Sequence, residues 1–372
     1  MTPAELSRTV LHAVRRAVDD GVLNVTVPER AVVTPPAPGG CGDYATNVAL
    51  QLARPAGQPA QHVAEILRAR LLGEWCVRDV VVTGPGFLNL SLESDASVGL
   101  VEEILRRGRR YGHAVGFSGN IAHMRCPAEV RAVVTADALA RALRSQGDFV
   151  RVECTGGLPA EAEWESVLGV DFSGREHVDF TGRGSRTFAD LRIDLRPVPA
   201  PADPVPLGRD AARWALLHPA PHDRPRITAD HLVQREANPL FRVRYAHART
   251  RALLRNADDL GLHPEPGPVP NTHTPPPLSS PAPDTNTPVL LPLLADHPRI
   301  LAATATHRSP DRLARHLVAV ADATLPLLSA VLPVGEDKPS AAHRARLALA
   351  EAAGAVLAGG LSLLGIDAPE HL

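Results

Sequence analysis

"NIAHMRCPAEVRAVVTADALARALRSQGDFVRVEC", residues 120–154, decides the fold in the middle of this 372-residue chain. A helical pattern closed by Gly147 lies between two stretches typical of strands, "NIAHM" and "DFVRVEC". A strand, a helix and a second strand in this order predict a parallel βαβ unit, because parallel strands need a crossover connection. From Gly156 to Pro206 the pattern fades into short strands and proline-rich turns, which predicts a small, incomplete sheet.

The residues before this stretch predict a compact α/β unit. The chain begins with a helical pattern in which Thr2 and Glu5 have the spacing of a capping box. Residues 22–27, "VLNVTV", alternate as a strand should, and a second helix is expected over about 59–72. Residues 77–92 then predict two strand segments that are interrupted by Gly-Pro-Gly.

The last third of the chain is expected to be helical. Helices are predicted over 208–219, from Thr228 to Gly261, over 309–333 and over 340–366. Residues 263–289 are too rich in proline and too polar to fold alone, and they are interpreted as an extended linker. The chain is thus divided into three predicted domains, residues 1–112, 113–204 and 205–372.

Composition sets limits on function. A net charge of −2, with 44% hydrophobic and 22% charged residues, is ordinary for a soluble globular protein and argues against coating nucleic acid by bulk charge. The four cysteines contain no Cys-x-x-Cys pair and are interpreted as reduced thiols of a cytosolic protein. We find no signal peptide or lipidation motif, no apolar run expected to cross a bilayer, and no metal-ligand spacing, so we expect a cytoplasmic protein without a metal.

One segment concentrates charge and aromatic side chains. Residues 238–255, "NPLFRVRYAHARTRALLR", hold five arginines and two aromatics in a chain that is only 3% aromatic. In one interpretation the aromatic side chains pack in the core and the arginines are solvated. In the other, one face of arginines contacts RNA phosphates, and an aromatic ring offers a surface on which an unstacked base can lie. We favour the RNA reading, for which the candidate residues are Phe241, Arg242, Arg244, Tyr245, Arg249, Arg251 and Arg255.

Three blocks, in this order, resemble bacterial arginyl-tRNA synthetases. They are "GDYATNVALQLA" with "GPGFLNLSL", then "LGRDAARWALL" with "NPLFRVRYAHAR", and finally "RLALAEAAGAVLAGGLSLLGIDAPEHL". The resemblance implies an α/β N-terminal domain, a reduced Rossmann-like α/β remnant and an all-α anticodon-binding helix bundle of the DALR type at the C-terminus.

The resemblance also implies RNA contacts. In the family the N-terminal domain contacts the tRNA elbow, which makes Asn47, Phe87 and Asn89 candidates; their alternative roles are a core aromatic and two asparagines that cap local backbone. The family usually has a tyrosine and a glutamine where this chain has Arg242 and Arg244. Its C-terminal end lies beside the anticodon, whereas a frayed terminus is the alternative for the ending of this chain.

The family's catalytic signatures are absent from the matching positions. Where the H-x-G-H motif would stand the chain has Cys-Pro-Ala-Glu, residues 126–129, and the region of the KMSKS loop, 192–206, contains no lysine. Adenylate formation depends on preorganised donors around the phosphoryl group, and losing one costs about 2.7–4 kcal/mol of barrier. We therefore expect no catalytic residues.

The sequence predicts a tRNA-binding, non-catalytic protein related to arginyl-tRNA synthetases, which needs no cofactor. Its expected partners are tRNA, in particular arginine isoacceptors, and the full-length synthetase. Two alternatives stay open: an active arginine–tRNA ligase that uses ATP and arginine with atypical motifs, and a protein-interaction module that has lost RNA binding.

Overall fold

The computed structural model describes residues 2–34, 36, 41–92, 94–155, 164, 166–170, 189–269, 287–333 and 340–372. Its contacts divide the chain into two compact units. One comprises Met1–Arg106, Leu262–Asp296 and Ala330–Leu349, and the other comprises Arg107–Gly261, His297–Ser329 and Ala350–Leu372. The division into three domains made from the sequence stays a prediction.

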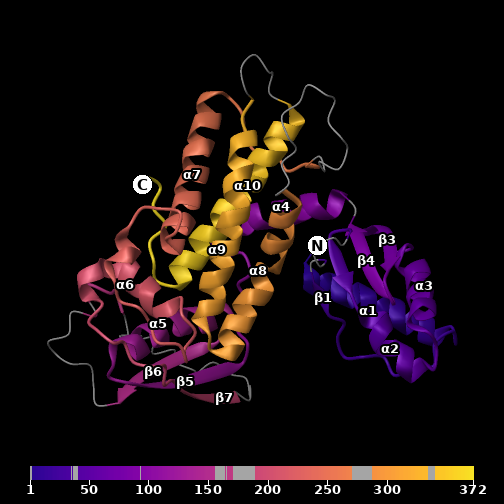
Figure 1. Cartoon of the computed structure of the whole chain (residues 1–372), viewed down its shortest axis with the longest axis horizontal. Helices are drawn as coiled ribbons and strands as arrows, with labels where there is room; N and C mark the ends of the chain where they lie inside the picture. Colours follow the sequence, from indigo (N-terminus) through magenta and orange to yellow (C-terminus); the bar gives the residue numbers. More distant parts are fainter. Residues whose placement is uncertain are drawn as a thin grey trace, which may run out of the picture. The chain divides into compact units, whose positions relative to one another are not determined.

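The N-terminal part of the first unit is an α/β structure (Figure 1). Its elements are α1 (Pro3–Asp19), β1 (Val33–Thr34), β2 (Tyr44–Thr46), α2 (Val48–Ala56), α3 (Ala60–Leu71), β3 (Val77–Thr83), β4 (Phe87–Leu92) and α4 (Ser94–Arg107). The strands form an antiparallel sheet in the order β1-β2-β4-β3. The capping box predicted at Thr2 and Glu5 is confirmed, and the apolar faces of α1 and α3 enter the core.

The turn between β3 and β4 confirms the predicted break at Gly-Pro-Gly. Thr83 pairs with Phe87 at the end of the hairpin. Gly86 has a φ of 138°, and a Cβ at this position would lie 2.9 Å from the carbonyl oxygen of Ala60. Glycine is therefore required both by the backbone conformation and by the close approach of α3.

The strand predicted over residues 22–27 is wrong. The amides of Val22 and Leu23 both donate to the carbonyl of Ala17 at the end of α1, so they cannot join a strand ladder. Gly21, with a φ of 71°, allows the chain to turn there. The alternation of apolar residues therefore belongs to a helix terminus and the loop that follows it.

The parallel βαβ unit predicted in the middle of the chain is confirmed in the second unit. β5 (Asn120–Pro127) leads through α5 (Val130–Ser145) to β6 (Phe149–Thr155), and β7 (Ala189–Asp194) is the third strand. All three strands are parallel, in the order β6-β5-β7, and α5 packs on one face of β5 and β6. This small sheet is what the sequence predicted.

The remaining helices form the C-terminal bundle (Figure 1). They are α6 (Gly208–Leu217), α7 (Pro239–Asp259), α8 (Thr287–His307), α9 (Pro310–Leu327) and α10 (Ala341–Leu363). The helices predicted at α6, α9 and α10 are confirmed, whereas α8 was not predicted. Glycines on α10 permit close packing: a Cβ at Gly354 would lie 2.6 Å from the hydroxyl of Thr250 on α7.

α7 begins later than the sequence predicted. Its first residue is Pro239, and Asn238 caps it by accepting from the amide of Leu240 at 3.1 Å. The same side chain donates to the carbonyls of His231 and Val233, each at 2.9 Å, which holds the preceding loop. Proline disfavours the helical conformation in the residue that precedes it, here Asn238 before Pro239, so the helix does not extend back to Thr228.

Most of the proline-rich linker predicted over 263–289 lies outside the described residues, which resume with the first residues of α8 at Thr287. Among the described helices, Pro310–Ala330 and Ala341–Leu363 are long and apolar enough to span a membrane by length and composition. In the folded protein, 56% of the apolar segment of the first helix and 78% of that of the second are buried. That burial is typical of bundle core helices.

Candidate nucleic-acid interface

Three side chains on α7 form one column at the surface, named here the α7 column: half-buried Phe241 and the exposed Tyr245 and Arg249. The rings of Phe241 and Tyr245 stack with centroids 5.3 Å apart and planes inclined by 19°. The guanidinium carbon of Arg249 lies 6.0 Å from the centre of the Tyr245 ring. Tyr245 is 37% exposed and Arg249 is exposed, so the column presents an aromatic face and a cation to solvent.

The column exists because its members are four residues apart, which places them one above another on a helix. The opposite side of α7 is apolar or small and carries the packing: Val243 and Ala246 are fully buried. An aromatic pair that is stacked and partly exposed offers a rigid surface with little side-chain entropy to lose on binding. Such a surface can accept the face of an unpaired base.

The other four predicted arginines on α7 have partners inside the protein. Arg242 lies 3.2 Å from Asp322, and Arg244 lies 3.3 Å from Asp210. Arg251 and Arg255 both face Glu370, at 3.2 and 3.9 Å. No carboxylate among the described residues is ion-paired with Arg249, which leaves it as the cation of the α7 column that is open to a ligand.

The C-terminal tail lies along α6 and α7, in contrast to a frayed terminus. The amide of Asp367 donates to Asp210 at 3.0 Å, and the Nδ1 atom of His247 lies 2.9 Å from the carbonyl oxygen of Pro369. Burial lowers the pKa of His247, so a neutral ring with a proton on Nδ1 donates this bond. Glu370 was not singled out in the sequence, because its partners on α7 are distant along the chain.

The three predicted residues of the N-terminal unit differ in accessibility. Asn89 is 4% exposed, and its amide donates to the carbonyl of Val81 and to the hydroxyl of Thr83. Asn47 accepts a bond from Gln51 at 3.0 Å at the start of α2. Phe87 is 41% exposed beside the hairpin turn. Of the three, Phe87 is the side chain that this surface offers to a partner.

The amino end of α5 is occupied by a side chain of the protein itself. The carboxylate of Glu129 accepts from the amides of Arg131 at 3.1 Å and Ala132 at 2.9 Å, and from the amide of Ala200 at 3.0 Å. A helix amino terminus is otherwise a favourable site for phosphate. Here an internal anion already takes these donors, and its charge opposes a second anion.

Two buried arginines then fix the surroundings of α5. Arg131 is 1% exposed and donates to five carbonyl oxygens, those of Leu216, Val198, Asp223, Pro219 and Ala220. Arg213 on α6 is fully buried and donates to Asp137 on α5 at 2.5 Å. Both guanidinium groups are used structurally, and neither is available for a substrate.

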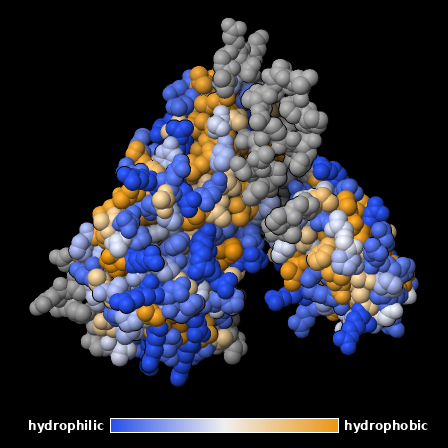
Figure 2. All heavy atoms as spheres, in the orientation of Figure 1, coloured by the Kyte–Doolittle hydropathy of each residue, from blue (hydrophilic) through white to orange (hydrophobic). Residues whose placement is uncertain are grey.

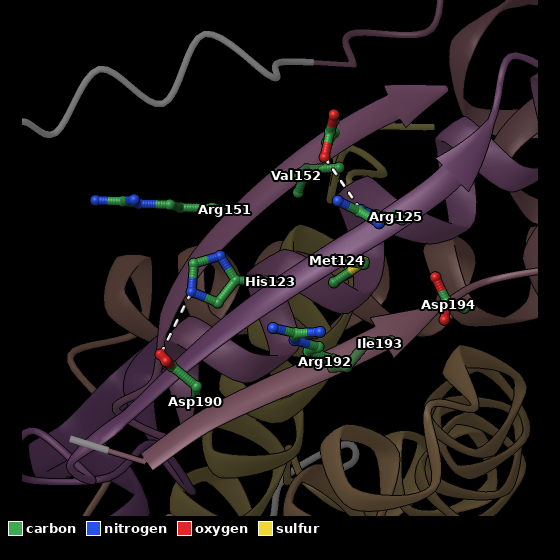
Figure 3. Close-up of a pocket in the computed structure, with 10 residues that line it drawn as sticks. His123, Met124, Arg125, Arg151, Val152, Asp190, Arg192, Ile193 and Asp194 are labelled. Carbon is green, nitrogen blue, oxygen red and sulfur yellow. Dashed lines mark hydrogen bonds and ion pairs between the residues drawn. The ribbon is translucent and has the colours of Figure 1, made fainter. Parts of the chain in front are cut away.

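The face of the β6-β5-β7 sheet that does not pack on α5 is charged (Figure 3). Register brings Arg151, His123 and Arg192 side by side across the three strands. Ion pairs link His123 to Asp190 at 3.4 Å and Arg125 to Glu153 at 3.2 Å. They line a shallow hollow of about 600 Å³, and Figure 2 shows hydrophilic residues projecting from this lower part of the unit.

A second hollow, of about 620 Å³, follows the carboxyl end of β7 and is lined by four arginines and three aspartates. The arginines are Arg196, Arg308, Arg312 and Arg315, and the aspartates are Asp194, Asp223 and Asp311. Arg315 is paired with Asp311 at 2.6 Å, so part of the positive charge is neutralised. Within the described residues, no group of three or more His, Cys, Asp or Glu side chains is placed to hold a metal ion.

Comparison with known proteins gives matches at both ends of the chain. Residues 4–92 match the arginyl-tRNA synthetase N-terminal domain, and residues 243–372 match the DALR anticodon binding domain. The arginine–tRNA ligases of Frankia alni and Renibacterium salmoninarum are 27% and 26% identical, with 100% of each chain covered. The first alignment spans 561 positions against 372 residues here, so at least 189 of its positions have no counterpart in this chain.

Solved structures agree on the fold. The Thermus thermophilus arginyl-tRNA synthetase aligns over 100% of both chains with a TM-score of 0.62 and 16% identity. The Plasmodium falciparum enzyme aligns over 100% of this chain and 99% of its own, with a TM-score of 0.68 and 10% identity. The two domain matches and the shared fold place the chain among relatives of aminoacyl-tRNA synthetases. Within that class, its matched domains, its relatives and its fold are those of the arginyl-tRNA synthetase family.

Proposed function

We propose that this protein binds tRNA through its DALR-type bundle, with the α7 column as the contact for an unpaired anticodon base, and that it does not charge the tRNA. The observation that carries the proposal is the stacked pair of half-buried Phe241 and exposed Tyr245, extended by Arg249, on the helix at which the DALR match begins. Family membership supports tRNA as the ligand rather than another polyanion.

The energetics of the column favour a base as the occupant. A base that stacks on an aromatic side chain gains about 1–3 kcal/mol, and this gain depends little on base identity. Arg249 adds a cation beside the ring for the neighbouring phosphate or the base itself. Because four of the five arginines on α7 are ion-paired internally, the contact is local and does not require a strongly positive protein.

The non-catalytic part of the proposal is supported by the amino end of α5. In place of a histidine motif, Glu129 puts a carboxylate on two amides of the first turn of α5 and on the amide of Ala200. A transferring phosphoryl group needs preorganised positive charge, and a fixed carboxylate opposes it. The proposal carries with it a cytoplasmic location and no requirement for ATP or arginine as cofactors.

Two assays on the purified full chain test the two parts separately. Filter binding with an arginine-accepting tRNA should give an affinity that falls as salt rises, by roughly 0.7 to 0.9 log units per log salt for each phosphate contact. An affinity that is absent, or that does not change with salt, contradicts tRNA binding and favours a protein-interaction module. ATP–pyrophosphate exchange in the presence of arginine and tRNA should stay at the level of a no-enzyme control.

One observation favours an active arginine–tRNA ligase as a second candidate. The hollow beyond β7 brings Arg196, Arg308, Arg312 and Arg315 together, and such a group could neutralise a leaving pyrophosphate. Exchange above the control in the wild-type chain, abolished by Arg312→Ala, would establish this candidate and refute the non-catalytic proposal. The three aspartates in the same hollow are the reason that we rank it second.

A further inference from the structure

Two of the four cysteines meet at the carboxyl ends of neighbouring strands. Cys126 on β5 and Cys154 on β6 are opposite each other in the parallel register, and their sulfur atoms lie 3.2 Å apart. Both thiols are free. The other two cysteines of the protein, Cys41 and Cys76, belong to the first unit.

The backbone at this pair already has the dimensions of a disulfide site. Neighbouring strands lie about 4.7–4.9 Å apart, and disulfides join Cα atoms that are roughly 4.4–6.8 Å apart. Residues opposite each other in a ladder point to the same face of the sheet, so the two Cβ atoms are on one side. The sulfur atoms can therefore come into bonding distance by side-chain rotation, without movement of either strand.

The two thiols differ in access. Cys126 is 1% exposed, whereas Cys154 is half-buried. Burial is the main cause that raises the pKa of Cys126, and the neighbouring sulfur adds to it. Cys154 is therefore the thiol that a soluble oxidant reaches first, and Cys126 is placed to react with it from inside.

We propose that Cys126 and Cys154 form a redox-active pair that hydrogen peroxide converts into an intramolecular disulfide. In the first step the Cys154 thiolate attacks the peroxide: an S–O bond forms, the O–O bond breaks, and hydroxide leaves and takes up a proton as water. In the second step the Cys126 sulfur attacks the sulfenic acid of Cys154, an S–S bond forms, and the S–O bond breaks. The leaving hydroxide takes the Cys126 proton, so two thiols and one peroxide give one disulfide and two waters.

The disulfide would join the two strands that precede and follow α5 in the chain. Cys126 lies three residues before Glu129, the cap of α5, and Cys154 follows Cys126 by 28 positions, so the bond would close a loop that contains α5. The pair thus links the oxidation state of the protein to the rigidity of the turn that leads into α5. The effect does not depend on whether the bundle binds tRNA.

The test uses the reduced full chain, treated with hydrogen peroxide, alkylated and mapped by mass spectrometry under non-reducing conditions. The expected product is a peptide linked through Cys126 and Cys154, with a loss of two alkylated thiols per chain that dithiothreitol reverses. Cys154→Ser should abolish the linked peptide. Cys76→Ser, which removes a buried thiol elsewhere, is the matched control and should leave the link unchanged.

A second measurement shows which of the two thiols the peroxide oxidises first. In Cys126→Ser the sulfenic acid of Cys154 cannot be resolved, so dimedone should label Cys154 in this variant and much less in the wild type. The proposal is overturned if wild-type Cys126 and Cys154 remain fully alkylated after peroxide, if Cys154 reaches the sulfinic state without a link, or if the disulfides formed are intermolecular through Cys41.

Discussion

Arg251 lies 3.2 Å from the carboxylate of Glu370, and this ion pair joins α7 to the C-terminal tail. The same carboxylate faces Arg255 at 3.9 Å, so one acidic residue near the end of the chain engages two of the five arginines on α7. Charge that looks available for RNA in the sequence is thus used to hold the tail. The distinction between engaged and open arginines leads to the first two predictions.

Tyr245→Ala should weaken tRNA binding by about 5- to 150-fold, because the stacking surface is worth about 1–3 kcal/mol. The side chain is partly exposed, so the melting temperature should change little. Leu260→Ala is a matched control, since it removes a 63% exposed apolar side chain just beyond the same helix. Equal affinity losses in both variants would contradict a specific role for the aromatic column.

Arg249→Ala and Arg251→Ala should differ in their effects on tRNA affinity and stability, although the two residues are only two positions apart on α7. The first removes an open cation and should lower tRNA affinity and reduce the salt slope by about 1, with stability unchanged. The second breaks a partly exposed ion pair and should cost up to about 1 kcal/mol of stability. Filter binding across a salt series and thermal melting measure both. Identical salt slopes would show that Arg249 does not contact phosphate.

Asp137→Ala should destabilise the protein by about 3–5 kcal/mol, because it leaves Arg213 buried and without its carboxylate. Arg141→Ala is the control: Arg141 also pairs with Asp137, at 3.0 Å, but its side chain is 32% exposed. We expect a cost of about 1 kcal/mol or less there. Denaturant unfolding followed by circular dichroism gives both values, and similar losses would argue against the buried pair as the cause.

The stability of the protein should fall as the pH drops below about 6.5, the value for an unperturbed histidine. Burial lowers the pKa of His297 well below its usual range, and the neighbouring His316 and His113 lower it further. The unfolded chain then binds more protons than the folded one, so the free energy of unfolding rises with pH and is lost on acidification. From this group alone, the loss at pH 5.5 is about 1.4 kcal/mol.

His297→Phe should reduce that pH dependence, since phenylalanine keeps the stack with Tyr111 and His316 but does not titrate. His222→Phe, which changes an 84% exposed ring, should leave the dependence as it is in the wild type. Unfolding free energies at pH 5.5 and 7.5 make the comparison. A wild-type slope that persists in His297→Phe would assign the effect to other groups.

Glu129→Ala should lower stability by about 1–2 kcal/mol, because three backbone amides lose their acceptor at the start of α5. Glu153→Ala removes an exposed carboxylate from the neighbouring strand and is the control. Thermal melting of the two variants measures the difference. A Glu129→Ala variant as stable as the control would mean that water replaces the carboxylate without cost.

The sequence predicted the elements that have a clear period and a clear boundary. The βαβ unit follows from strand and helix patterns that Gly147 separates, and α1 from its capping box. α8 could not be predicted in this way, because three prolines within it oppose a helix. Burial of Leu290, Leu294 and Leu301 shows that packing of its apolar face outweighs local propensity.

The candidate site was predictable in outline only. Helical spacing places Phe241, Tyr245 and Arg249 on one line, but no spacing rule reveals that Arg251 meets Glu370. For Asn89, which alternates with buried leucines, the sequence left open an RNA contact or a bond to local backbone. The amide of Asn89 enters bonds within the hairpin, which is a tertiary detail that strand alternation does not report.

The charged face of the three-stranded sheet restricts what can pack on it. Parallel sheets normally carry helices on both faces, and their strands are apolar throughout. Within the described residues, this face instead carries Arg125, Glu153 and their neighbours. Placing an apolar helix on it would strip water from these ions, at several kcal/mol each. A segment that covers this face must therefore bring polar or charged partners for the side chains of the strands beneath it.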